Sequence, residues 1–378
     1  MAKAQTTSST ATQPAPSFGW APSVGRLFGI EIRIHLTFLL LLAFLGLAHW
    51  LPDRDLQAAL IGVAFFSLLF VCVVLHELGH ALAARQFGIK TQDITLLPIG
   101  GVARLERMPE KPAQELWVAV AGPLVNVVIA VGLFLGLKMT GQWHPIEQVS
   151  ATGGNLAERL WAANVFLVMF NLLPAFPMDG GRVLRAFLAM GMPYAKATRT
   201  AARVGQGMAV LFGFAGLFIN PMLILIAVFV WAGAEQEATS AEMKSSFAGV
   251  PVRDAMLVEF QSLHPTDTLG DVARLILAGT QKDFPVVDGG GQVIGIVTHA
   301  NFFQALAEYG DDAVVTAAMT EDFETAEAGD WMEDVFGRAR PGGCTTVPVL
   351  RDGELVGLLT AENIGEFVMI QAARKRFG

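Results

Sequence analysis

The stretch from Val71 to Ala84, VCVVLHELGHALAA, sets three ionisable side chains inside an apolar run. Residues 56–70, which lead into it, carry no formal charge. Ionisable groups at membrane depth are energetically unfavourable, and those that occur there usually serve a function. The stretch therefore predicts a membrane helix that carries a functional site.

His76, Glu77 and His80 form the pattern H-E-x-x-H. On a helix, His76 and His80 lie four residues apart on one face, where two imidazoles can share one Zn²⁺. Glu77 lies beside them as a candidate general base for an attacking water. The alternative is a chance pattern containing two core histidines.

A third ligand is predicted at Asp179, the only Asp or Glu between Arg159 and Ala234. Asp179 lies within NLLPAFPMDGGR, the segment that ends the fourth candidate span, at the same predicted depth as the two histidines. Two histidines and one carboxylate would leave a fourth position open for water, as in catalytic zinc sites. The alternative is an N-cap for a helix starting at Gly181.

The composition fits a membrane protein with a soluble part attached. The mean hydropathy is +0.49, and 53% of the residues are hydrophobic. We predict a polytopic α-helical membrane protein with about six spans, followed by an α/β module. The candidate spans are residues 36–52, 57–80, 115–137, 157–173, 203–219 and 221–235. Only Asn220 and Pro221 separate the last two, so a re-entrant pair is the alternative there.

Charge predicts the orientation of the spans. With the amino terminus inside, thirteen Lys and Arg fall on that side and three on the other. This positive-inside bias predicts a multi-pass protein of the cell (inner or plasma) membrane with both termini cytoplasmic.

Residues 237–378 carry 10 Lys and Arg against 22 Asp and Glu, which argues against a nucleic-acid partner.

The segment between the second and third candidate spans, Thr91 to Pro112, is too short and broken to cross a bilayer. A hairpin or re-entrant loop there could lie near the metal and pair with an extended peptide along a strand edge. The candidate substrate-binding residues are Pro98, Ile99, Gly100 and Gly101. A plain cytoplasmic loop is the alternative.

Asn126, in the third candidate span, places an amide where few partners exist. It could hydrogen-bond another helix, or it could face the metal and support an oxyanion. Cys72 lies one turn before His76 and is interpreted as a packing residue.

The acidic half contains an internal repeat. VRDAM recurs as VTAAM, with Met256 and Met319 63 residues apart, and Pro285 and Pro348 have the same spacing. Each copy predicts a helix, an apolar hairpin and a closing helix. The expected organisation is a disordered segment (1–24), a membrane domain (25–236), a linker (237–249), two repeats (250–308 and 309–370) and a basic tail (371–378), which could contact the lipid bilayer.

HELGH, GPLVN and NLLPAFPMDGG together resemble the site-2 protease family of intramembrane zinc metalloproteases. The resemblance covers roughly residues 25–235 and implies that His76, His80 and Asp179 hold one Zn²⁺. It implies Glu77 as general acid and base, Asn126 as a catalytic group near the reacting carbonyl, and the PIGG stretch as a substrate loop. The implied activity is hydrolysis of peptide bonds in transmembrane segments of client proteins.

The repeats resemble a tandem of cystathionine-β-synthase (CBS) domains, a family that often binds adenine nucleotides. In that family an Asp usually contacts ribose three residues after the threonine that closes the hairpin. Here Asn301 follows Thr298 and Asn363 follows Thr360. A nucleotide-responsive regulator and a purely structural or homodimer-forming module both remain open.

Two other functions fit parts of the pattern. A transporter or channel with a regulatory CBS pair would use its intramembrane polar residues along an ion path. A relative that binds clients without cutting them would need no base, and Glu77 argues against it. The sequence therefore favours an intramembrane zinc endopeptidase.

Overall fold

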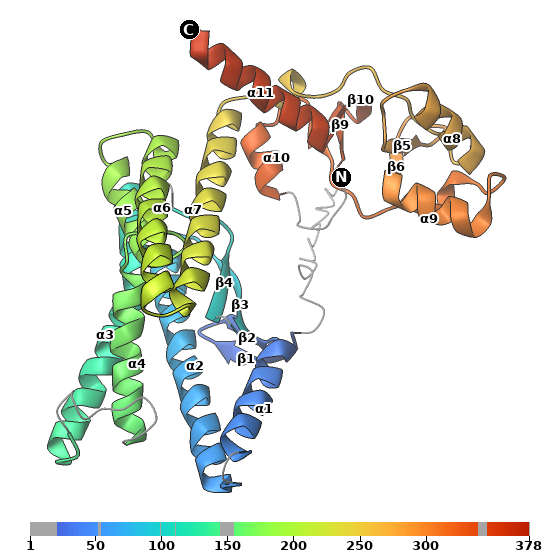
Figure 1. Ribbon diagram of the computed structural model, residues 1–378. Helices are drawn as coiled ribbons and strands as arrows, with labels where there is room; N and C mark the ends of the chain where they lie inside the picture. Colours follow the sequence, from blue (N-terminus) through green and yellow to red (C-terminus); the bar gives the residue numbers. More distant parts are fainter. Residues whose placement is uncertain are drawn as a thin grey trace, which may run out of the picture. The chain divides into compact units, whose positions relative to one another are not determined.

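The computed structural model describes residues 21–377 except 52–53, 99, 110, 144–154 and 339–345. The chain divides into two compact units, Met1–Ala238 and Thr239–Gly378 (Figure 1). Most of the segment predicted to be disordered, residues 1–20, lies outside the described residues.

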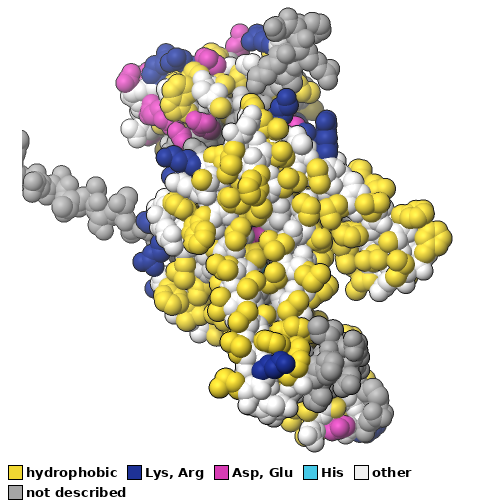
Figure 2. All heavy atoms as spheres, turned by 90° about the vertical axis from the view of Figure 1, so that its left-hand side faces the viewer, with side chains coloured by type: hydrophobic (Ala, Val, Ile, Leu, Met, Phe, Trp, Pro, Cys, Tyr) yellow, Lys and Arg dark blue, Asp and Glu magenta, His cyan; other side chains and the backbone are white. Residues whose placement is uncertain are grey.

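The first unit is mainly helical, and hydrophobic side chains cover much of the face that Figure 2 shows. Its helices are α1 (Leu36–Trp50), α2 (Leu56–Arg85), α3 (Pro112–Met139), α4 (Leu156–Asn171), α5 (Asp179–Ala189), α6 (Tyr194–Phe218) and α7 (Met222–Phe247). Four described helices, α2, α3, α6 and α7, are long and apolar enough to cross a membrane. The count of six spans was therefore approximate, because α1 has 15 residues and α4 has 16, fewer than the roughly 20 that a full crossing needs.

The last two apolar runs form two long helices rather than a short re-entrant pair. α6 has 25 residues and α7 has 26. The predicted linker at 237–249 contains the boundary between the two units, but most of it is helical, since α7 continues to Phe247. The apolar run ends near Ala234, but the following EQEATSAEMKSS holds several strong helix formers and neither Gly nor Pro, so the helix has no reason to stop.

A four-stranded sheet lies beside these helices. It contains β1 (Ser23–Leu27), β2 (Ile30–Ile34), β3 (Thr91–Leu97) and β4 (Gly100–Leu105), in that order. β3 and β4 form the predicted antiparallel hairpin, and β2 pairs with β3 in parallel. β4 is therefore an edge strand in the described sheet.

The first two strands were not predicted. β1 starts at Ser23, inside the segment expected to be disordered. The signal was present in IEIRI, whose alternating residues Ile30 and Ile32 are buried against the helices.

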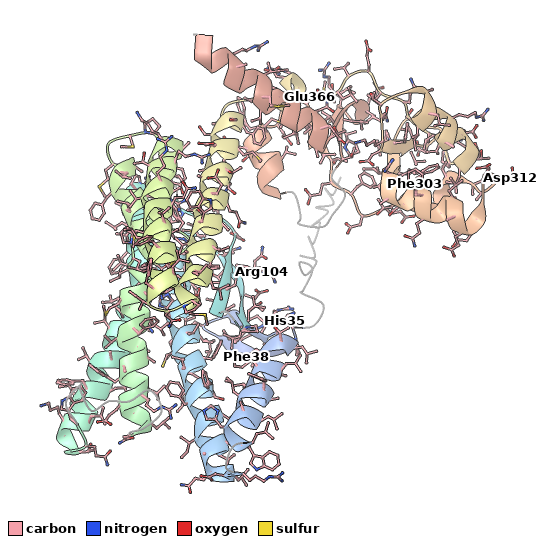
Figure 3. All side chains as sticks on the ribbon, viewed as in Figure 1. His35, Phe38, Arg104, Phe303, Asp312 and Glu366 are labelled. Carbon is pink, nitrogen blue, oxygen red and sulfur yellow. The ribbon has the colours of Figure 1, made fainter. Side chains whose placement is uncertain are left out.

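The sheet is fixed to α2 by an apolar core. This core joins Phe38 of α1, Phe70, Val74 and Leu78 of α2, and Ile94 of β3. The rings of Phe38 and Phe70 lie 4.3 Å apart, and Figure 3 labels Phe38 near the start of α1. This packing holds the hairpin against the part of α2 that carries the H-E-x-x-H motif.

The second unit contains two similar halves with separate cores. The first half has α8 (Leu269–Ala278), β5 (Phe284–Val287), β6 (Val293–Val297) and α9 (His299–Tyr309). The second has β8 (Ala326–Glu327), α10 (Met332–Arg338), β9 (Val347–Arg351), β10 (Glu354–Leu359) and α11 (Ala361–Phe377). Between the halves, β7 (Met319–Thr320) pairs with β6 of the first half. The sheets have the orders β5-β6-β7 and β10-β9-β8. The predicted repeat is confirmed, but α11 extends through most of the range expected to be a separate basic tail.

Candidate metal centre and peptidase site

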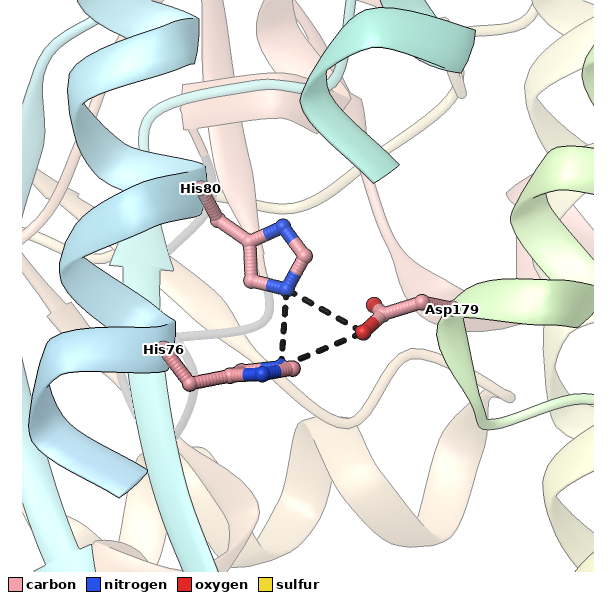
Figure 4. Close-up of side chains that lie close together, drawn as sticks. All are labelled: His76, His80 and Asp179. Atoms are coloured by element: carbon pink, nitrogen blue, oxygen red, sulfur yellow. Dashed lines mark hydrogen bonds and ion pairs between the residues drawn. The ribbon is translucent and has the colours of Figure 1, made fainter. Parts of the chain in front are cut away.

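Two elements bring the three predicted metal ligands together (Figure 4). His76 and His80 project from one face of α2, and Asp179 is the first residue of α5. The Nε2 atoms of the two histidines are 3.1 Å apart, and each lies 3.2 Å from Oδ2 of Asp179. All three side chains are buried. The N-cap of α5 is Met178, so the alternative reading of Asp179 as a cap is wrong.

The far nitrogen of each imidazole faces an oxygen. Nδ1 of His80 donates to the backbone carbonyl of Val118 at 2.7 Å, and Nδ1 of His76 donates to Oδ1 of Asn126 at 2.7 Å. A proton on each Nδ1 leaves a lone pair on each Nε2. Two nitrogen lone pairs and a carboxylate oxygen thus point at one space, an arrangement that a cation stabilises.

The spacing fits a tetrahedral ion. Metal–ligand bonds of 2.0–2.1 Å at tetrahedral angles put neighbouring ligand atoms about 3.3 Å apart. The three separations here are 3.1, 3.2 and 3.2 Å. Three protein ligands also leave one position for water or substrate, which is the arrangement of catalytic rather than structural zinc sites.

Small residues allow this close packing. A β-carbon on Gly79 would lie 2.8 Å from the carbonyl oxygen of Ala121, so α2 and α3 can approach only at a glycine. A β-carbon on Gly181 would lie 2.6 Å from backbone atoms of Ala175 and Phe176. The glycines after Asp179 therefore let α5 start directly against the preceding loop.

A cavity of about 360 Å³ opens beside the three ligands. Glu77 lines it together with Gly100 and Gly101 of β4. Of the other two predicted substrate-binding residues, Pro98 is exposed and is not among the lining residues, and Ile99 lies outside the described residues. The predicted loop thus contributes its two glycines to the cavity wall.

Other lining residues were not predicted as site residues. Arg182 lies on the wall, as do Asn171, Phe170 and Phe229. Asn171 and Arg182 flank the segment that contains Asp179, so their position in that motif was an available signal. Phe229 comes from α7, and nothing in the sequence connects it with the H-E-x-x-H motif.

Asn126 lies behind His76 and is fully buried. Its Oδ1 accepts from His76, and its Nδ2 donates to Oδ1 of Asn164 at 2.9 Å. It is not among the residues that line the cavity. Of the two predicted alternatives, these contacts support hydrogen bonding between helices, and the catalytic role of Asn126 stays a prediction.

The predicted nucleotide-binding residues of the second unit fall into two groups. Thr360 and Asn363 line a cavity of about 870 Å³, whereas Thr298 and Asn301 do not. Thr298 caps α9 by accepting from the backbone N–H of Asn301 at 3.2 Å. The cavity also contains Glu366 of α11, which Figure 3 labels.

Comparison with known proteins decides the family. Residues 64–155 and 147–214 match the model of peptidase family M50, and residues 252–308 match that of the CBS domain. A zinc metalloprotease of Methanocaldococcus jannaschii is 34% identical over 304 residues, which cover 80% of this chain and 85% of that protein. The chain belongs to peptidase family M50. The two matched ranges contain His76, His80 and Asp179.

Further relatives extend the comparison. A protein of Synechocystis sp. is 29% identical over 382 residues, covering 93% of this chain and 96% of that one. Stage IV sporulation protein FB of Bacillus subtilis is 29% identical over 196 residues, covering 52% and 60% of the two chains. A solved site-2 protease from Methanocaldococcus jannaschii is 38% identical and covers 58% of this chain and 95% of that one, with a TM-score of 0.43.

Membership of family M50 and the apolar helices make the protein a membrane metalloprotease. The predicted resemblances to site-2 proteases and to CBS domains are both confirmed. The alternative of a transporter or channel is not supported.

Proposed function

We propose that this member of family M50 is a zinc endopeptidase that cuts peptide bonds within membrane-spanning segments of other proteins. The observation that carries the proposal is the convergence of His76, His80 and Asp179 on one space beside Glu77, in a cavity that an edge strand also lines. The zinc named for the Methanocaldococcus relative suits this set of two nitrogens and one oxygen.

Bound zinc would polarise the scissile carbonyl and lower the pKa of an attacking water. Glu77 is the residue that takes the proton from this water and passes it to the leaving amine. Glu77 is half-buried on α2 and lines the cavity next to both histidines, so its carboxylate can reach a substrate in the cavity. Asp179 completes the ligand set and holds no proton in this role.

The edge strand β4 is the proposed docking site for the substrate. Gly100 and Gly101 line the cavity, and β4 pairs with β3 on one side only among the described strands. An extended peptide could therefore add to the open side through main-chain hydrogen bonds. Pairing of this kind needs an unwound substrate, because a helix already uses its backbone hydrogen bonds internally.

We further propose that the chain crosses the cell membrane several times, with both termini and the CBS pair in the cytoplasm. The thirteen-to-three distribution of Lys and Arg supports this orientation. A fluorescent protein fused after Gly378 should fold and fluoresce, and a periplasmic reporter enzyme at the same point should be inactive. Activity of the periplasmic reporter would reverse the proposed orientation.

The peptidase is tested with purified full-length protein in detergent and a set of single-span test proteins. We expect Glu77→Gln to lower the cleavage rate by about 10² to 10⁴-fold while one zinc per chain is retained. A chelator should stop cleavage by the wild type, and added Zn²⁺ should restore it. Glu106→Gln is the matched control, because Glu106 is exposed and lies outside the cavity lining. Cleavage that survives Glu77→Gln would exclude this mechanism, and bound zinc without any cleavage would favour a non-cutting client binder.

We also propose that the CBS pair regulates the peptidase through α7. A β-carbon on Gly233 of α7 would lie 2.7 Å from Cδ of Pro177, two residues before Asp179. Glu237 of α7 accepts from Arg185 of α5 at 2.9 Å. The same helix contributes Phe247 to the core of the second CBS half. A shift of α7 caused by a change in that core would therefore be felt at Pro177, before Asp179, and at Arg185, after it.

An adenine nucleotide is the proposed regulatory ligand, in the cavity lined by Thr360 and Asn363. The test is the cleavage rate of a fixed substrate with and without AMP or ATP. A change of at least about twofold that disappears in Gly233→Val would support both the ligand and the route through α7. An unchanged rate, with binding absent by calorimetry, would leave the module with a structural role.

A further inference from the structure

We infer that Asn164 is a positioning residue that fixes the tautomer and orientation of His76. Asn164 lies on α4, is fully buried and does not line the catalytic cavity. The inference rests on the proposed role of His76 as a zinc ligand.

A directed chain of hydrogen bonds leads from Asn164 to His76. Nδ2 of Asn164 donates to the backbone carbonyl of Leu160 at 2.8 Å, and Oδ1 of Asn164 accepts from Nδ2 of Asn126 at 2.9 Å. Oδ1 of Asn126 accepts from Nδ1 of His76 at 2.7 Å. The side chain of Asn164 also donates to Sγ of Cys72 at 3.5 Å.

The direction of this chain is set at its outer end. A backbone carbonyl can only accept, so Asn164 must turn its NH₂ group toward Leu160 and its oxygen toward Asn126. Asn126 must then turn its NH₂ toward Asn164 and its oxygen toward His76. The proton of neutral His76 is therefore held on Nδ1, and Nε2 keeps the lone pair that a metal needs.

The two histidines differ in how they are held. Nδ1 of His80 donates to the backbone carbonyl of Val118, and no change of side chain at position 118 removes that acceptor. His76 depends on two amide side chains that could each flip if left alone. Hydrogen-bond partners behind a metal-bound histidine typically change metal affinity by about 10 to 100-fold when they are mutated. Loss of Asn164 should lower the metal affinity in the same way, because Asn164 decides which end of the Asn126 amide faces His76.

The test measures the rate at which a chelator removes zinc from purified full-length protein. We expect Asn164→Leu to speed zinc loss about 10 to 100-fold. Asn164→Ser provides a milder variant, since its hydroxyl can bond the carbonyl of Leu160 but is too short to reach Asn126. Cys72→Ala is the matched control. It contacts the same side chain but lies outside the path to His76, and we expect it to change zinc loss less than twofold.

Rescue separates positioning from packing. In Asn164→Leu/Asn126→Asp, a carboxylate offers His76 an oxygen whichever way it turns, so it needs no orienting partner. We expect this double variant to lose zinc within about threefold of the wild-type rate. Equal rates in wild type, Asn164→Leu and Asn164→Ser would overturn the inference, as would a folded double variant that still loses zinc as fast as Asn164→Leu. Wild type that binds no zinc would instead overturn the proposed function itself.

Discussion

Gly122 of α3 faces the ring of His80 so closely that a β-carbon at this position would lie under 3.0 Å from three atoms of the ring, one of them the metal-facing Nε2. Val118, whose carbonyl accepts the hydrogen bond from His80, lies on the same helix, one turn before Gly122. α3 therefore both orients this imidazole and leaves the space it fills.

Gly122→Ala should consequently displace a ligand, although alanine favours helices more than glycine does. We expect the cleavage rate to fall by about 100-fold or more, together with faster zinc loss, because a shift of about 1 Å at a catalytic group has effects of this size. The matched control is Gly132→Ala on the same helix, where a β-carbon meets nothing within 4 Å. Equal activity of the two variants would mean that the His80 ring can move without loss.

Gly101 should be equally sensitive for a different reason. A β-carbon there would lie 2.8 Å from Cγ of Glu77, so Gly101→Ala pushes the proposed general base away from the cavity. We expect kcat to fall by about 10 to 100-fold while zinc content stays at the wild-type value. Gly25→Ala is the control in the same sheet, since its added carbon has no neighbour within 4 Å. Loss of zinc in Gly101→Ala would point to collapse of the site instead.

Arg185 is expected to matter for stability. It bonds Glu115, a fully buried carboxylate on α3, and Glu237 on α7. Arg185→Leu would leave the Glu115 charge without its cation, which typically destabilises a protein by about 3–5 kcal/mol. Arg199→Leu, which affects the more exposed pair with Glu235, should cost about 1 kcal/mol or less. Thermal unfolding of both variants in the same detergent measures the difference, and similar midpoints would contradict it.

On the proposal that the CBS cavity takes an adenine nucleotide, its charge predicts which nucleotide binds better. Four described carboxylates line it, and Lys282 is the one lysine or arginine among the described residues of its wall. The carboxylates are Glu259, Asp283, Glu362 and Glu366. The hydrogen bond from Lys282, 2.8 Å long, lowers the pKa of Glu362, and the same contact raises the pKa of Lys282.

Both members of that pair therefore stay charged at neutral pH, and the lowered pKa keeps Glu362 ionised further into acid than a free glutamate. We expect AMP to bind about tenfold or more tightly than ATP, because each added phosphate meets like charge. The preference should shrink as salt is raised and should persist between pH 6 and about 8. Titration calorimetry at two salt concentrations measures it, and tighter binding of ATP would contradict the prediction.

The grouping of His76, His80 and Asp179 was predictable from the sequence. Helical spacing alone puts His76 and His80 on one face, and the scarcity of carboxylates in the apolar half singled out Asp179. The contribution of Asn164 was hidden, because an asparagine in an apolar helix gives no sign of which distant amide it meets. Phe229 and Gly233 were hidden for the same reason, since both act through contacts between helices far apart in the chain.

The errors in the fold have a common physical origin. Hydropathy marks where a helix can be buried but not where it ends, so α7 was cut short at the last apolar residue. Strands β1 and β2 were missed because five-residue strands gain their stability from neighbours, and β2 has β3 as a neighbour only after a separation of about sixty residues.

The unbroken course of α7 from Met222 to Phe247 also limits how the protein can change by insertion or deletion. One added residue between Ala238 and Phe247 would rotate everything after it by about 100° around the helix axis, whereas seven residues would complete nearly two whole turns. On the proposal that regulation passes through α7, other modules could replace the CBS pair only at lengths that preserve the helical phase. An insertion series of one to seven alanines would be expected to alternate between regulated and unregulated proteins rather than to decline steadily with length.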